Sequence, residues 1–382
     1  MMGKWENCTI ADLGTVVGGA TPSTKRSENF EGGTIAWITP KDLAGFKGRF
    51  ISHGERNLTE KGLKSCSAQM MPKHTILFSS RAPIGYVAIA SNEVCTNQGF
   101  KSIIPNDRID YMFLYYLLLY NKNNIKQMAS GTTFKEISGK AMRSIKVCIP
   151  EAKEEQIKIS SILSAIDSKI EENERINKNL LQQAQALFEE RFLSYDNLPI
   201  GWKRMALGDV SDMSAGGDKP KNISDQRTEA YQYPIYSNGI SNDGLYGFTT
   251  DYKISAESVT VSARGTIGFV CLRHIPFTPI VRLITLVPHS SIISAKYLYL
   301  WLKSIPIYGT GTTQQQLTVP DFRKTEILIP SEADMREFSE TVDPLFQQVW
   351  ANQEENEKLA DVRDALLPHL MSGELNVSDL DL

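Results

Sequence analysis

The amino-acid sequence repeats itself, and this repeat is the strongest constraint on the fold. Trp5 is followed by Leu-Gly at 13–14, and Trp202 is followed by Leu-Gly at 207–208. The other blocks that match between the copies are 75–90 with 258–273, 111–120 with 296–304, and 129–150 with 308–330. A chain of 382 residues is long enough for two domains. We therefore predict two similar domains, residues 1–150 and 196–330.

Each copy has the pattern of an α+β domain. Short runs of alternating apolar residues bounded by turn-forming residues predict strands, and the segments 111–120 and 296–304 predict short apolar helices. Each copy ends at an Ile-Pro pair. Because proline restricts the residue before it and is common at the start of a helix, Pro150 and Pro330 mark the domain boundaries.

Both copies are followed by long amphipathic segments, 151–195 and 331–375, and residues 376–382 form a tail. No Gly or Pro interrupts 151–192, and apolar residues recur at heptad-like spacing in both segments. We predict two long helices, with a kink at Pro344 in the second. The first would carry the chain roughly 63 Å from one domain to the next at about 1.5 Å per residue. The second, if it packs on the first, must therefore run antiparallel to it.

The apolar stripe of each predicted helix is interrupted at the same register by asparagines. Asn173 and Asn177 stand in the first helix, and Asn352 and Asn356 in the second. A buried Asn in a coiled coil fixes register because it retains its hydrogen bonds only opposite a polar partner. We predict that Asn173 meets Asn356 and Asn177 meets Asn352 in an antiparallel, pseudo-twofold coiled coil. The alternative is two independent surface helices.

Composition excludes several classes of protein. The N-terminal segment lacks the apolar core of a signal peptide, and no run is long enough to span a membrane. The five cysteines are scattered and contain no Cys-x-x-Cys pair, which argues against a disulfide framework or a zinc site. We expect a cytoplasmic protein without a membrane partner and without a metal.

Charge is distributed unevenly along the chain. Residues 1–150 hold 19 Lys and Arg against 11 Asp and Glu, and residues 196–330 hold 13 against 11. The two helical segments are acidic, with 6 against 9 in 151–195 and 3 against 13 in 331–382. Basic domains that alternate with acidic helices allow the domains to face the phosphates of a nucleic acid.

The order of these motifs, given twice, resembles the specificity subunits of type I restriction-modification systems. The resemblance rests on Trp then Leu-Gly at each start, the blocks around Arg81 and Arg264, the Gly-Thr-Thr blocks, the Ile-Pro boundaries and both long helices. It covers nearly the whole chain. The second copy departs from the first in being shorter and only weakly basic.

The resemblance implies two target recognition domains that each read one half of a split, asymmetric site in double-stranded DNA, with the paired helices as a spacer. It also implies assembly with two methylation subunits and, for cleavage, with restriction subunits. S-adenosylmethionine and ATP would belong to those subunits, so that this chain would bind no cofactor and catalyse nothing.

The residues themselves agree with a chain that has no catalytic centre. No Asn/Asp-Pro-Pro-aromatic loop of a methyltransferase is present, the two Gly-Lys pairs lack the rest of a phosphate-binding loop, and the histidines lack metal-ligand spacing. The rival interpretations are a non-enzymatic scaffold whose tandem modules bind protein or glycan, and an enzyme with an unrecognised site.

The candidate DNA contacts combine a suitable residue type with an expected position in a loop. Arginine forks onto guanine or clamps phosphate, Asn and Gln fork onto adenine, and Thr hydroxyls suit phosphate oxygens. The candidates are Lys25, Arg26, Lys41, Arg49, Lys73, Arg81, Thr132, Thr133, Lys219, Lys221, Asn238, Arg264, Thr312, Thr313 and Gln314. For Arg81 and Arg264 a structural role in bridging a loop stays open, and for the threonines a plain turn does.

Overall fold

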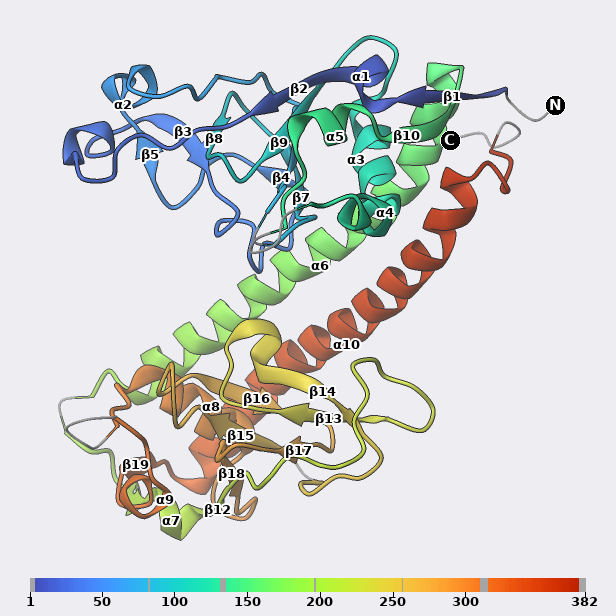
Figure 1. The fold of residues 1–382 in the computed structure, drawn as a ribbon. Coiled ribbons are helices and arrows are strands. Elements are labelled where there is room, and N and C mark those ends of the chain that lie inside the picture. Colours follow the sequence, from blue (N-terminus) through green and yellow to red (C-terminus); the bar gives the residue numbers. More distant parts are fainter. Residues whose placement is uncertain are drawn as a thin grey trace. The chain divides into compact units, whose positions relative to one another are not determined.

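The computed structural model describes residues 4–81, 83–130, 135–195, 197–255, 257–309 and 315–377. The chain divides into two compact units (Figure 1). Unit 1 comprises residues 1–174 and 353–382, and unit 2 comprises residues 175–352. Both boundaries fall inside long helices, α6 (Lys153–Phe192) and α10 (Glu332–Met371). Each unit therefore contains one copy of the repeat and a part of both helices.

The described strands of unit 1 form three sheets. The largest has the strand order β2-β9-β6-β7-β4, the second has the order β5-β3-β8, and β1 pairs with β10 alone. The pairing of β1 with β10 places Trp5 opposite Pro150, so both ends of the first repeat meet in one sheet. The strands are β1 (Trp5–Thr9), β2 (Gly14–Gly18), β3 (Ile35–Ile38), β4 (Phe50–Ile51), β5 (Asn57–Leu58), β6 (Ile76–Phe78), β7 (Val87–Ala90), β8 (Cys95–Thr96), β9 (Lys101–Pro105) and β10 (Lys146–Pro150).

The described strands of unit 2 repeat this topology. Its sheets have the orders β12-β18-β15-β16, β14-β13-β17 and β11-β19, so that each strand of unit 2 has a counterpart in unit 1. The predicted internal repeat is thereby confirmed at the level of strand pairing. The strands are β11 (Lys203–Ala206), β12 (Ser211–Ala215), β13 (Tyr233–Tyr236), β14 (Leu245–Thr249), β15 (Ser258–Val261), β16 (Val270–Arg273), β17 (Thr278–Pro279), β18 (Ile284–Pro288) and β19 (Glu326–Ile329).

The two predicted short apolar helices are present as α3 (Tyr111–Tyr120) and α8 (Ala295–Ser304). Each starts at a capping residue: the Asp110 carboxylate accepts from the Phe113 amide, and the Ser294 hydroxyl oxygen accepts from the Tyr297 amide. The remaining helices are short. They are α1 (Ile10–Leu13), α2 (Glu60–Lys64), α4 (Lys122–Gln127), α5 (Gly139–Arg143), α7 (Leu207–Val210), α9 (Val319–Phe322) and the single turns η1 (Ser27–Asn29) and η2 (Ser241–Gly244).

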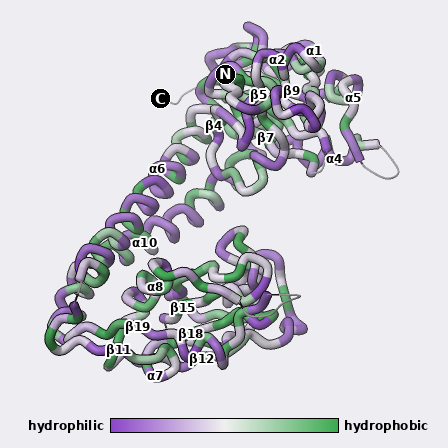
Figure 2. The backbone as a smooth tube through the Cα atoms, turned by 90° about the vertical axis from the view of Figure 1, so that its left-hand side faces the viewer, coloured by the Kyte–Doolittle hydropathy of each residue, from purple (hydrophilic) through white to green (hydrophobic). Residues whose placement is uncertain are grey.

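Each unit has its own hydrophobic core. In unit 1, α3 and the strands pack against Ile159 and Leu163 of α6 and against Leu370 and Val377 near the C-terminus. In unit 2, α8 packs against Phe188 and Phe192 of α6 and against Phe338 of α10. The long helices thus supply part of both cores, which is why they are amphipathic; Figure 2 shows hydrophilic and hydrophobic residues alternating along them.

Within each unit the helices α6 and α10 run antiparallel, and the asparagines pair as predicted. The Asn173 amide donates to Asn356 Oδ1 at 2.8 Å in unit 1, and the Asn352 amide donates to Asn177 Oδ1 at 2.8 Å in unit 2. The alternative of independent surface helices is therefore wrong. Helix α10 continues as one helix through Pro344, the position of the predicted kink.

Within the residues that the structure describes, no helix is both long and apolar enough to cross a membrane.

Candidate nucleic-acid interface

In unit 1, Arg81 lies in the turn that joins β6 to β7. The Ser79 hydroxyl donates to the carbonyl of Pro83 at 2.8 Å, and Gly85 closes the turn with a φ of +96°, a conformation that other residues rarely adopt. The Arg81 guanidinium lies 3.8 Å from the Glu136 carboxylate, which also accepts from Lys101 at 3.1 Å. A third of the Arg81 side chain stays exposed, with 34% of its area accessible.

Unit 2 builds the same turn between β15 and β16. The Ser262 hydroxyl donates to the carbonyl of Arg264 at 3.0 Å, and Gly268 closes the turn with a φ of +82°. The Arg264 guanidinium donates to Gln316 Oε1 at 3.0 Å. Gln316 stands 180 residues after Glu136, the same offset that relates the Gly-Thr-Thr blocks. Both arginines therefore face the residue at the matching position of the following block.

The same two blocks are tied to the arginine turns through the backbone. The Ile137 amide donates to the Ser80 carbonyl at 3.0 Å in unit 1, and the Leu317 amide donates to the Ala263 carbonyl at 3.0 Å in unit 2. The predicted contacts that belong to the Gly-Thr-Thr blocks lie outside the described residues. They are Thr132, Thr133, Thr312, Thr313 and Gln314.

Arg49 has a structural role that its sequence context did not indicate. Its side chain is only 6% exposed, and its guanidinium donates to the Glu171 carboxylate through Nε and Nη2 and to the hydroxyls of Ser164 and Ser168 on α6. Burial alone would lower the pKa of Arg49, but the bonds to Glu171 raise it above its ordinary value. The side chain of Arg49 therefore attaches the module to the helix, and its predicted contact with DNA stays a prediction.

A second buried polar cluster completes that attachment. The Tyr116 hydroxyl of α3 donates to Asp167 of α6 at 2.6 Å, and Arg363 of α10 donates to the same carboxylate at 2.8 Å. The pKa of Tyr116 is raised, first by burial and then by the charge of Asp167. Three elements of unit 1 are thereby held by hydrogen bonds to one buried charge, which specifies their mutual orientation.

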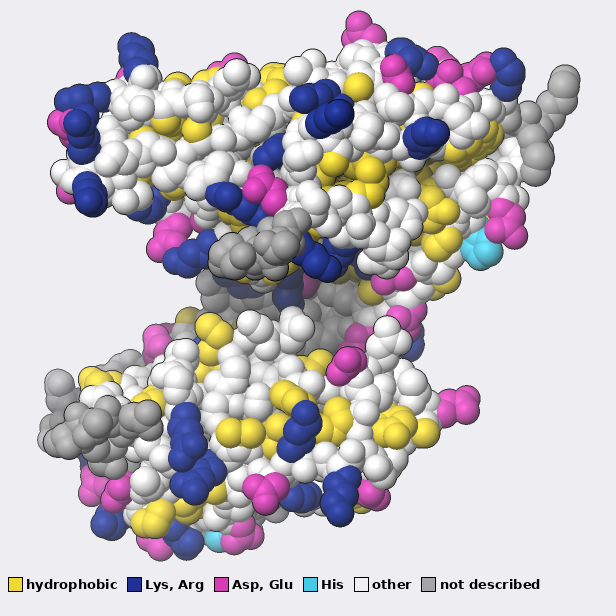
Figure 3. Space-filling model, in the orientation of Figure 1, with side chains coloured by type: hydrophobic (Ala, Val, Ile, Leu, Met, Phe, Trp, Pro, Cys, Tyr) yellow, Lys and Arg dark blue, Asp and Glu magenta, His cyan; other side chains and the backbone are white. Residues whose placement is uncertain are grey.

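The other predicted basic contacts of unit 1 lie on its surface. Lys25, Arg26 and Lys73 are exposed, and Lys41 is exposed with its ammonium 2.7 Å from Glu55. In the view of Figure 3 the Lys and Arg side chains lie in separate groups over the surface and form no single continuous patch on that face.

In unit 2, Lys219 and Lys221 are exposed, and the Lys219 ammonium lies over the Tyr246 ring at 4.5 Å and donates to its hydroxyl. Asn238 is used differently from its prediction as a base contact. Its amide nitrogen donates to the Val281 carbonyl at 2.6 Å, and its amide oxygen accepts from the Ala263 amide at 2.7 Å. Because both ends of the amide are bound to backbone, Asn238 joins two turns of unit 2, and its contact with a base stays a prediction.

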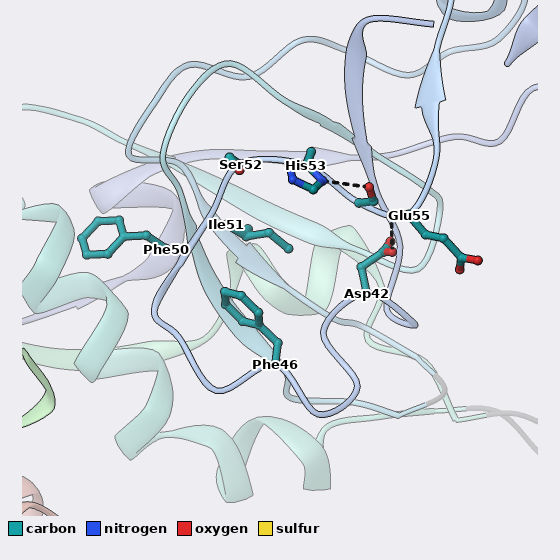
Figure 4. A pocket seen from close by; sticks show the side chains of 8 residues that line it. Asp42, Phe46, Phe50, Ile51, Ser52, His53 and Glu55 are labelled. Carbon is teal, nitrogen blue, oxygen red and sulfur yellow. Dashed lines mark hydrogen bonds between the residues drawn. The ribbon is translucent and has the colours of Figure 1, made fainter. Parts of the chain in front are cut away.

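A hollow of about 340 Å³ opens in unit 1 beside β4, where Phe46 and Phe50 present partly exposed rings (Figure 4). Its polar groups are occupied within the loop: Asp42 Oδ1 accepts from the Glu55 amide at 2.7 Å, and His53 Nδ1 lies 3.0 Å from the Gly54 carbonyl. In the part of the chain that the structure describes, no group of three or more His, Cys, Asp or Glu side chains is placed to hold a metal.

Comparison with known proteins decides the family. The model of the type I restriction modification DNA specificity domain matches residues 2–182 and again residues 199–360. The chain belongs to this family. Each half of the repeat is one specificity domain, and the chain is accordingly of the specificity-subunit type. The α+β fold with two similar recognition domains and paired long helices, predicted above, agrees with this assignment.

Individual relatives agree over nearly their whole length. The chain is 34% identical to the type I restriction enzyme MjaIX specificity subunit of Methanocaldococcus jannaschii, a match that covers 98% of this chain and 94% of the relative. It is 26% identical to the HindI specificity subunit of Haemophilus influenzae, over 82% and 89% of the two chains. The fold resembles the crystal structure of the type I restriction-modification S subunit from M. genitalium, with a TM-score of 0.59, 18% identity and coverage of 97% and 96%.

Membership of the specificity family disfavours the scaffold that binds protein or glycan. Sequence reasoning missed Glu136, the partner of Arg81, and Lys101, which binds the same carboxylate. Glu136 was detectable in principle, because it stands at the position that matches Gln316 in the other copy. Lys101 has no such indication, since its contact with Glu136 depends on the way β9 and the following block come together in space.

Proposed function

We propose that each unit reads one half of a bipartite, asymmetric site in double-stranded DNA, and that the chain performs no chemistry itself. One observation carries this proposal: the same arginine turn, tied to the same following block, occurs in both units with different neighbouring side chains. Arg81 faces a carboxylate, whereas Arg264 faces an amide. A shared frame with different polar groups is what two different half-sites require.

In this proposal the chain positions two methylation subunits on the site and, for cleavage, restriction subunits. The pairing of α6 with α10 sets the separation of the half-sites, and the asparagine pairs keep that register. The helical segments are acidic, with 9 Asp and Glu in 151–195 and 13 in 331–382, so their surfaces repel phosphate and stay available to protein partners.

The test uses the chain co-expressed with its methylation subunits. Sequencing of methylated DNA should give one bipartite motif, and binding to it should weaken steeply as salt rises because phosphate contacts release counterions. Arg81→Ala should weaken recognition of one half of the motif and Arg264→Ala the other half, with assembly unchanged in both.

Lys61→Ala is the matched control, because this exposed lysine of unit 1 is paired with Glu28 and is not a candidate DNA contact. The proposal is overturned by a complex that binds no duplex DNA. It is also overturned by methyl transfer from the purified chain alone, or by Arg81→Ala and Arg264→Ala affecting the same half of the motif.

A further inference from the structure

The turn between β17 and β18 in unit 2 has an unusual backbone. The Leu283 amide donates to the Ile280 carbonyl at 3.1 Å, which closes a tight turn over Val281 and Arg282. Both central residues lie in the left-handed region, with φ values of +53° and +61°. This is the geometry of a type I′ turn, for which Asn-Gly is the ordinary sequence. A β-branched valine is strained there.

The surrounding structure holds this turn in place. The Val281 amide donates to the Gly217 carbonyl at 2.9 Å, and the Arg282 amide donates to the Gly216 carbonyl at 2.8 Å. The Val281 carbonyl accepts the Asn238 amide, which also binds the arginine turn of this unit. Strained residues persist only when their neighbours fix them in this way, and such residues gather at ligand-binding sites.

The turn presents two side chains to solvent. Val281 is 50% exposed although it is apolar, and Arg282 is also exposed. Among the described residues the Arg282 guanidinium has neither a hydrogen-bond nor an ion-pair partner. Arg282 lines a hollow of about 390 Å³ together with Gln316, the residue that binds Arg264. The described lining contains no Asp or Glu, so the charge of Arg282 is not neutralised there.

Unit 1 has no such arrangement at the matching place. The turn between β8 and β9 holds Gln98 and Gly99 where unit 2 holds Val281 and Arg282, and neither Gln98 nor Gly99 has a positive φ. The position of Gln316 is taken by the acidic Glu136, which already binds Arg81 and Lys101. The exposed arginine on a strained turn is therefore specific to unit 2, the unit with the smaller excess of basic residues.

We propose that Arg282 is a specificity-determining residue of unit 2 that forks onto the major-groove edge of a guanine in its half-site, with Val281 as an apolar contact beside it. This inference rests on the proposed DNA-reading function. An arginine fork matches guanine O6 and N7, and apolar side chains contact the thymine methyl group. Arg264, which donates to Gln316 in the lining of the same hollow, contacts the neighbouring backbone or base.

The experiment determines the methylated motif and the DNA affinity of the complete complex with its methylation subunits. Arg282→Ala should bind the wild-type site about 10- to 100-fold more weakly, as expected for loss of one bidentate base contact. It should also methylate sites that carry other base pairs at one position of one half of the motif. Arg204→Ala is the control, because this exposed arginine of unit 2 is paired with Glu326 on β11 and β19.

Three results overturn the inference. One is an unchanged methylated motif in Arg282→Ala. Another is that Arg282→Ala loses affinity by the same factor for cognate and for unrelated DNA, and that its binding depends less on salt than that of the wild type. A residue that contacts phosphate behaves in this way. The third is an effect on the half of the motif that Arg81→Ala affects. If the wild-type complex methylates a bipartite motif, each result removes only this inference; if it recognises no DNA, the proposed function itself fails.

A second variant separates recognition from folding. The double substitution Val281→Asn and Arg282→Gly supplies the ordinary type I′ sequence, so it should raise the melting temperature of the chain by relieving strain. The same variant should lose the base preference at the affected position. A melting temperature below that of the wild type would contradict the strain in this turn. A higher melting temperature together with an unchanged methylated motif would contradict a role of the turn in recognition.

Discussion

Replacement of Arg49 tests whether its buried contacts, rather than DNA, account for this residue. The arginine is 5% exposed, and removal of one partner from a buried ion pair costs about 3–5 kcal/mol because the other charge stays uncompensated. The Glu171 side chain keeps 31% of its area exposed, so water compensates part of its charge, and we expect Arg49→Ala to cost about 3 kcal/mol, at the lower end of that range. For a unit of this size that loss corresponds to a fall of about 6–12 °C in melting temperature.

The assay is urea unfolding of the full chain followed by circular dichroism, with hydrogen exchange of the α6 amides around Ser164 and Ser168 to locate the change in unit 1. Lys41→Ala is the matched control, since its exposed pair with Glu55 should contribute less than about 1 kcal/mol. At a temperature where Arg49→Ala is folded, the complex should bind DNA as the wild type does. Equal, small stability losses in both variants, or a selective loss of DNA affinity in Arg49→Ala, would refute the structural role.

Three further outcomes follow from the contacts described above. Asn177→Leu should lower the free energy of unfolding in urea by about 1–3 kcal/mol, because the buried Asn352 amide loses its acceptor. Adding Asn352→Leu should recover most of that loss. A double variant that is no more stable than the single one would contradict this. Burial tends to raise the pKa of Glu171, but the hydrogen bonds and the charge of Arg49 lower it below its ordinary value of 4.5. The ionised carboxylate therefore stabilises the folded chain fully above pH 4.5, and this stabilisation is lost as the pH falls through the pKa of the folded state. Glu171→Gln should therefore reduce the fall in the free energy of unfolding that the wild-type chain shows below pH 4.5. An unchanged fall would contradict this role of Glu171. Trp202→Phe should cost about 1–2 kcal/mol by removing the indole hydrogen bond to Asp334, which a thermal melt can measure, whereas Asp334→Asn should cost less.

The sequence predicted the elements that depend on periodicity and repetition. Two copies of one topology, the short apolar helices α3 and α8 and the antiparallel pairing of the asparagines are all present in the structure. These features could be predicted because heptad spacing and a repeated block constrain many residues at once. Proline disfavours the interior of a helix, yet α10 continues through Pro344, where its neighbours Val342 and Phe346 are buried in the core of unit 2.

Side-chain roles were predicted less well because they depend on which surfaces the fold brings together. Arg49 and Asn238 have the chemistry of DNA contacts, yet one binds α6 and the other binds two turns of unit 2. Nothing in the neighbouring sequence of Arg49 shows that Glu171, more than a hundred residues later, would lie beside it. Arg282 was missed for the opposite reason, because its exposure results from a backbone conformation that the sequence Val-Arg disfavours.

The two units are assembled differently from the linear chain, and this matters while the polypeptide is being made. Unit 2 is one continuous stretch, whereas unit 1 needs residues after 352, including Leu370 and Val377, to cover its core. The ribosome therefore synthesises all of unit 2 before the last residues of unit 1 are made, although domains usually fold in the order of their synthesis. Until those last residues have been made, part of the apolar core of unit 1 has no cover, so the final closure of this unit comes at the end of synthesis.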